Sequence, residues 1–251
     1  MRGQGGLLCR ARDRHRIRPR SEVADRRRDC RAAAGAAYDG AMADKPQWLI
    51  REDASVSVLV ALALRQAIGI RAPDDLPSLR DLPVRAPDAT DVHPALEKQW
   101  RDYWDMTVEP RAHPSGVPLE LVEGFDTLVA LPASGAEELR EAVAPHAASV
   151  LHYARVAHDR YLTSIRSSMG TRSGAGTTNG ESYRAYASAI AEFERDIGRR
   201  AHSFELNVQV LPFSQRGIWW IGTLTVAVTD GLRRDVVSFD SAIRPIIAEL
   251  A

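Results

Sequence analysis

Lysine and cysteine are scarce in this chain of 251 residues. Of its 33 basic residues only Lys45 and Lys98 are lysines, and its two cysteines are Cys9 and Cys30. Residues 42–251 therefore hold no thiol. This excludes a disulfide scaffold, a cysteine nucleophile and a cysteine-ligated zinc site from that part of the chain.

Long apolar runs are missing as well. None approaches the roughly 20 residues that a membrane-spanning helix needs, so we expect no membrane association. Apolar residues make up 45% of the chain and charged residues 26%. Both values are close to the average for globular domains, which argues against disorder of the whole chain.

The chain also lacks the short motifs of common catalytic and nucleotide-binding sites. It contains no G-x-x-x-x-G-K-[ST], H-E-x-x-H, C-x-x-C or G-x-S-x-G sequence. Gly174 and Gly176 could begin a dinucleotide motif, but they lie between two expected helices rather than between a strand and a helix. We therefore expect no cofactor.

The formal net charge of zero hides a division of the chain. Residues 1–41 hold 11 arginines and 5 acids, whereas residues 42–251 hold 22 basic and 28 acidic residues. We expect residues 1–41 to be a disordered basic segment, with Met42 as an alternative start of the protein. Arginines of this kind can bind nucleic acid, but the acidic body argues against a nucleic-acid partner. No apolar stretch follows them as in a signal peptide, so we expect a cytoplasmic protein.

Hydrophobic spacing predicts a single α+β domain over residues 42–251. One buried helix of about four turns is expected around the apolar run Val56–Leu64, with the preceding Glu52 and Asp53 at its N-terminus and Gly69 at its end. Another is expected over Pro94–Met106, whose aromatic stripe we assign to the core. Between these helices, five prolines make residues 71–94 an extended connector.

Two longer amphipathic segments follow. A long helix is expected to end at Met169, and a second to cover Glu181–Ala201. Apolar residues recur three and four apart in both, which is typical of an antiparallel helical hairpin. The glycine-rich loop over Gly170–Gly180 would join them.

Alternating apolar residues predict an antiparallel sheet of three to five strands at the C-terminal end. Strands over 204–210 and 218–228 would form a hairpin with Val210 opposite Trp220. Asp230-Gly231 would turn the chain into a third strand, placing Phe239 opposite Gly222. A short helix from Ser241 to Leu250 would complete the fold.

The outer face of this sheet supplies the candidate binding site. Leu211, Trp219 and Ile221 fall on the face opposite the expected core, and exposed apolar groups on a sheet often mark a contact surface. The alternative is that a helix covers this face and makes it part of the core.

One pair of residues supports a catalytic alternative. His158-Asp159 is similar to the pair with which metal-dependent phosphohydrolases of the HD type hold a divalent ion, and His113 and Asp196 could supply further ligands. Against this, Asp159 lies between Arg155 and Arg160 as in a solvated charge cluster. His146, His152 and His158 are spaced six apart, so they project about 120° from one another on one helix.

These observations favour a non-enzymatic binding or interaction module. It would act through the helical hairpin and the sheet face, on an unknown protein partner or by self-association. The alternative is the metal-dependent hydrolase at His158 and Asp159.

Overall fold

A computed structural model of the chain describes residues 47–82, 93–109, 116–170 and 180–251. The chain divides into two units, Met1–Ala43 and Asp44–Ala251, and all of these residues belong to the second. The basic segment over 1–41 and the loop joining the two long helices lie outside the described residues.

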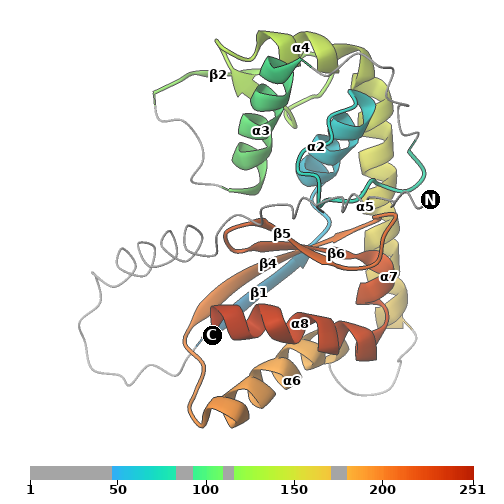
Figure 1. Ribbon diagram of the computed structural model, residues 1–251. Coiled ribbons are helices and arrows are strands. Elements are labelled where there is room, and N and C mark those ends of the chain that lie inside the picture. The colour runs from blue at the N-terminus through green and yellow to red at the C-terminus, as the bar shows by residue number, and fades with distance from the viewer. Residues whose placement is uncertain (1–46, 83–92, 110–115, 171–179) are drawn as a thin grey trace, which may run out of the picture. The chain divides into compact units, whose positions relative to one another are not determined.

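The described part combines helices and strands, which confirms the α+β class in outline (Figure 1). In chain order, its elements are β1 (Trp48–Asp53), α2 (Val56–Ala67), α3 (Pro94–Val108), β2 (Leu119–Leu121), β3 (Ala130–Pro132), α4 (Glu137–Val143), the 3-10 turn η2 (Ala144–His146), α5 (Ala147–Gly170), α6 (Gly180–Ile197), β4 (Phe204–Leu211), β5 (Ile218–Gly222), β6 (Thr225–Thr229), α7 (Asp230–Arg233) and α8 (Val236–Leu250).

The main sheet has the strand order β1-β4-β6-β5. β1 and β6 run parallel to β4, and only β5 runs antiparallel to its neighbour β6. The expected antiparallel sheet is therefore wrong in two respects. Two of its three strand pairings are parallel, and the strand β1 lies near the start of the described residues rather than in the C-terminal segment. β2 and β3 form a separate two-stranded antiparallel sheet.

The expected pairing of Val210 with Trp220 is also wrong, because the long apolar run is two strands rather than one. Thr223 and Leu224 turn the chain between β5 and β6, so Gly222 pairs with Thr225. The turn places β6 between β5 and β4, and Val210 pairs with Val228 instead. All five residues of β6 are buried, as expected for an inner strand covered on both faces.

The third expected strand is a helix. α8 begins at Val236, five residues before the expected start, and the Asp235 side chain caps it by accepting a hydrogen bond from the Ser238 amide at 3.1 Å. Phe239, Ile243 and Ile247 recur four apart and are fully buried. Four-residue spacing fits a helix, and Val237, which would share a strand face with Phe239, is 81% exposed.

The beginning of the domain also differs from expectation. Glu52 and Asp53 end the strand β1 instead of opening a helix, and the first turn of α2 holds no acid. The predicted helix itself is confirmed, because α2 covers Val56–Ala67 and buries most of its residues in the core. The aromatic stripe of α3 is core as expected, with Trp100 fully buried and stacked on Trp104.

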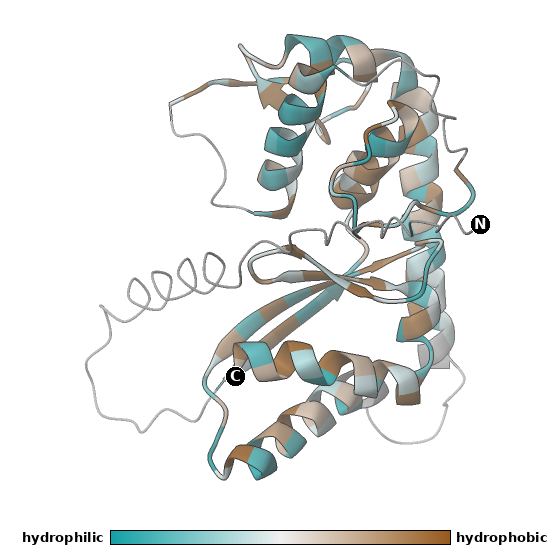
Figure 2. Ribbon diagram, viewed as in Figure 1, coloured by the Kyte–Doolittle hydropathy of each residue, from teal (hydrophilic) through white to brown (hydrophobic). Residues whose placement is uncertain are grey.

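The expected helical hairpin is not a packing unit. α5 packs against α2, and α6 packs against α8, so their apolar residues belong to two different clusters. One cluster joins α2, α3 and α5 to one face of the main sheet, and the other joins α6 and α8 to the opposite face. Hydrophobic and hydrophilic positions alternate along these helices in Figure 2, and burial of the apolar positions in the two clusters accounts for the helical spacing without a hairpin.

Candidate functional site

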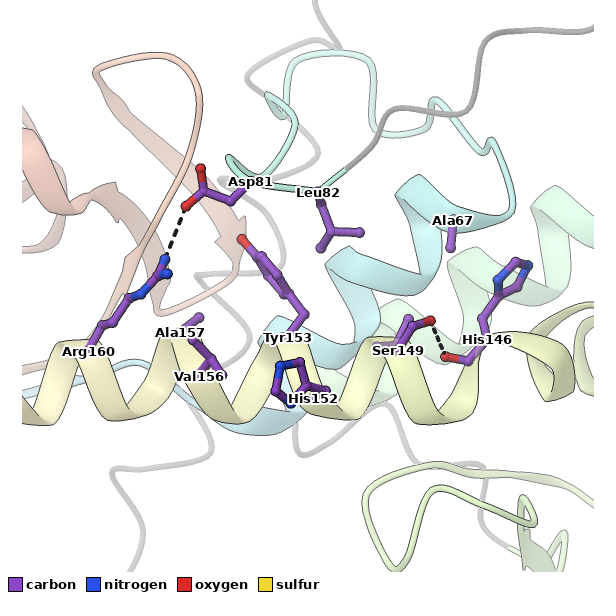
Figure 3. Close-up of a pocket in the computed structure, with 11 residues that line it drawn as sticks. Ala67, Asp81, Leu82, His146, Ser149, His152, Tyr153, Val156, Ala157 and Arg160 are labelled. Carbon is purple, nitrogen blue, oxygen red and sulfur yellow. Dashed lines mark hydrogen bonds and ion pairs between the residues drawn. The ribbon is translucent and has the colours of Figure 1, made fainter.

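The structure has an open cleft along one side of α5. It has a volume of about 630 Å³ and lies between α5, the end of α2 at Ala67, and residues Asp81 and Leu82 of the connector (Figure 3). Sites for small molecules commonly occupy roughly 300–1,000 Å³.

The helical period of α5 builds the floor of the cleft. Val150, Tyr153, Ala157 and Arg160 recur three and four apart and therefore share a face of the helix. Val150 and Ala157 are buried and give this face an apolar floor, with Val156 beside them. Polar side chains mark the two ends, Arg160 at one and His146 at the other.

Two buried polar residues at the end of α2 hold the connector that forms the opposite wall. Gln66 accepts a hydrogen bond from the Leu79 amide at 2.9 Å and donates one to the Leu82 carbonyl at 2.8 Å. Arg65 donates to the carbonyls of Arg71, Pro73 and Leu76 at 2.7 to 2.9 Å. These bonds satisfy backbone groups that a proline-rich segment cannot pair with itself.

The connector is also joined to the main sheet. Leu79 forms an isolated antiparallel bridge with Phe213, just after β4. The Arg80 amide donates to the Pro212 carbonyl at 2.8 Å, and Ser78 accepts from the Ser214 amide at the same distance. The wall of the cleft is thus fixed to elements on both sides of it.

Hydrogen-bonding groups surround the apolar floor. The Tyr153 hydroxyl donates to the Arg80 carbonyl at 2.8 Å, and burial, reinforced by the nearby Asp81 carboxylate, raises the pKa of Tyr153 to about 12. Arg160 Nη1 donates to Asp81 Oδ2 at 3.0 Å across the open side. The Ser149 hydroxyl donates to the His146 carbonyl at 3.0 Å (Figure 3).

The three residues proposed as a binding surface lie elsewhere. Leu211 and Ile221 are buried in the cluster that includes α2 and α3, and Trp219 packs against the same cluster. Trp219 meets Phe213 edge to face, with ring centroids 5.2 Å apart. Helices cover this face of the sheet, as the alternative in the sequence analysis expected, and a binding role for these residues stays a prediction.

The His158-Asp159 pair is divided between two environments. His158 Nδ1 lies 2.8 Å from the Ala54 carbonyl, and because a carbonyl can only accept, this nitrogen carries the proton. Asp159 is exposed. Over the described residues, no three histidine, cysteine or acidic side chains gather where they could hold a metal ion; His113 falls outside those residues.

His146 and His152 both line the cleft, whereas His158 does not. Independent positions were expected for all three, and two of them instead face one site. Tyr153, Asp81 and Leu82 were not singled out from the sequence. The helical period of α5 could have identified Tyr153. No sequence pattern near Asp81 indicates its contact with Arg160, which lies 79 residues further along the chain.

A second polar cluster lies where β1 ends. Arg233 donates two hydrogen bonds to the Glu52 carboxylate, and the Tyr186 hydroxyl donates to the same group at 3.1 Å. Burial lowers the pKa of Arg233, but hydrogen bonds with Glu52 and its charge outweigh this and raise the pKa above its usual value. The cluster joins β1, α6 and α7.

Within the described ranges, no helix has both the length and the apolar content to cross a bilayer. Comparisons with protein-family models, with curated proteins and with solved structures give no match to this chain.

Proposed function

We propose that this protein is a non-enzymatic binding protein whose site is the cleft beside α5, and that its ligand is a small amphipathic molecule. The observation that carries the proposal is the pairing of an apolar floor with hydrogen-bonding groups at both ends of the cleft. The sequence also predicts a non-enzymatic module, but one that contacts a protein partner or another copy of the chain through the helical hairpin and the sheet face, so both the site and the kind of ligand proposed here differ from that expectation.

The chemistry of the lining supports a ligand with an apolar body and a polar end. Val150, Val156, Ala157 and Leu82 offer surface to a hydrocarbon chain, and each buried methylene contributes about 0.8 kcal/mol. Arg160, Tyr153 and His146 offer polar atoms that orient such a molecule.

A titration with 1-decanol tests the proposal. We expect the NMR signals of the Val150, Tyr153 and Ala157 amides to shift on addition of 1-decanol, because these residues lie beneath the cleft. Ala67→Phe fills the cleft from the end of α2 and should weaken binding at least about tenfold. The matched control is Ala148→Phe, at an exposed position of α5 outside the cleft.

Two outcomes would contradict the proposal. The first is an absence of saturable shifts with 1-decanol. The second is equal binding by the Ala67→Phe and Ala148→Phe variants, which would place the alcohol elsewhere on the protein.

A second candidate is a contact with a protein partner or with another copy of the chain. Val117, Leu119 and Leu121 expose large apolar side chains on and just before β2. Clustered apolar side chains on a strand favour association. Light scattering on the full chain tests self-association, and Leu119→Glu together with Leu121→Glu should abolish any dimer formed through β2.

The metal-dependent hydrolase at His158 and Asp159 stays a hypothesis, as does the cytoplasmic location. Metal analysis of the purified protein tests the hydrolase. A stoichiometric divalent ion that is lost in His158→Ala would support it and would overturn the non-enzymatic assignment.

A further inference from the structure

Arg160 is the fixed positive charge that lines the cleft, and its partner there is Asp81. The pair is held by one contact, from Nη1 to Oδ2 at 3.0 Å, and the two side chains are 66% and 70% exposed. Exposed pairs of this kind contribute little to stability because water and salt screen them. Displacement of the Asp81 carboxylate by a competing anion therefore costs little free energy.

Asp81 is held at this place by its backbone. It has a φ of 62°, in the left-handed region that residues other than glycine seldom adopt. Hydrogen bonds fix the residues around it, because Gln66 binds Leu79 and Leu82 and the Tyr153 hydroxyl binds the Arg80 carbonyl. Such a conformation persists where the surroundings hold it, and it often lies at a functional site.

Arg160 suits the cleft to an anionic ligand once Asp81 is displaced. Among the described residues of the lining, α5 and η2 contribute Arg160, His146 and His152, and the connector contributes Asp81. When the Asp81 side chain rotates away, the Arg160 guanidinium remains at one end of the apolar floor without that partner. A guanidinium binds a carboxylate with strong, charge-assisted hydrogen bonds.

We propose that the cleft recognises a monocarboxylate with an aliphatic chain, and that the ligand carboxylate takes the place of Asp81 on Arg160. This inference rests on the proposed function, since it names the chemical class of the ligand of the same site. Asp81 occupies Arg160 in the free protein and is the group that an incoming ligand must displace.

The experiment compares decanoate with 1-decanol, at pH 8 and below the concentrations at which either aggregates. We expect the full-length protein to bind decanoate about threefold to fivefold more tightly than the alcohol, because Arg160 is exposed and water screens its charge. Arg160→Gln should remove this preference, because it should weaken binding of decanoate more than binding of 1-decanol. The matched control is Arg155→Gln, which removes an exposed arginine of α5 that pairs with Asp126 outside the cleft.

Asp81→Asn provides an independent measurement, since it removes the competing charge. It should tighten binding of decanoate several-fold and change that of 1-decanol by a smaller factor. Equal affinities of the unmodified protein for decanoate and 1-decanol would overturn the inference and leave the proposed function standing. Failure of both probes to bind would overturn the proposed function instead. A preference for decanoate that survives Arg160→Gln would also overturn the inference.

Discussion

The guanidinium of Arg233 binds the carboxylate of Glu52 through two hydrogen bonds, from Nε at 2.8 Å and from Nη2 at 3.0 Å. The two residues are 181 positions apart, and their side chains are only 12% and 20% exposed. Arg233 also lies over the ring of Phe239, with its guanidinium carbon 4.5 Å from the ring centroid. This contact ties the first strand of the domain to α7.

Removing one partner of this pair should destabilise the fold. Arg233→Met leaves the Glu52 carboxylate partly buried without its cation, and we expect a loss of about 3 kcal/mol in the free energy of unfolding, measured with urea. The control is Lys98→Met, which breaks an exposed pair with Asp102 and should cost below about 1 kcal/mol. Equal losses in the two variants would contradict the structural role of Arg233.

Asp235, which caps α8, should make the free energy of unfolding depend on pH. The hydrogen bond from the Ser238 amide, with those from Arg216 and the Ser238 hydroxyl, lowers the pKa of Asp235 from 3.8 to about 2. Because the pKa of Asp235 is lower in the folded state, the ionised side chain stabilises the fold above its ordinary pKa. This stabilisation is lost as the pH falls from about 4 to about 2.

Asp235→Asn keeps an oxygen that can cap α8 but removes the charge. We expect its melting temperature to fall less steeply than that of the unmodified protein between pH 4 and pH 2. Thermal unfolding followed by circular dichroism measures this difference. Parallel curves over that range would show that Asp235 does not carry the dependence.

Arg65 should be required for the connector to keep its conformation. The side chain is 8% exposed, and its guanidinium serves backbone carbonyls of residues 71–77. Arg65→Met leaves those carbonyls without their donor, and we expect a loss of about 3 kcal/mol. Hydrogen exchange should accelerate at the Leu79 amide. Arg71→Ala is the control, because it removes an exposed side chain and keeps the carbonyl that Arg65 binds.

The C-terminal segment offers a direct test of helix against strand. In α8, Phe239 is fully buried whereas Val237 is 81% exposed. Phe239→Ala should cost about 3–5 kcal/mol, and Val237→Ala should change stability by less than about 0.5 kcal/mol. In a strand these residues would share one face, so similar losses at both would favour the strand over the helix.

Local patterns predicted the helices better than the sheet. The apolar run after Val56 and the aromatic stripe around Trp100 each identify a helix and its buried face, because both signals lie within one segment. The C-terminal sheet failed because the run over 218–228 is continuous in sequence, and only the turn at Thr223 and Leu224 divides it.

The strand β1 was missed for a different reason. Trp48–Asp53 is short, ends in two acids and becomes part of a sheet only by pairing with β4. The alternation of β4 identifies it as a strand but does not indicate that so distant a segment pairs with it. The cleft depends on the same kind of contact, since Arg160 and Asp81 meet only when the connector is folded against α5.

The parallel pairing of β1 with β4 has a consequence during synthesis. Arg51 of β1 contacts Glu205 of β4, 154 residues further along. Ribosomes add about 5–20 residues per second, so β4 is synthesised roughly 8–30 seconds after β1. During this time the unpaired backbone of β1 can pair with strands of other chains. Closing so long a loop also slows folding. The nascent chain should therefore be most prone to aggregation before β4 emerges.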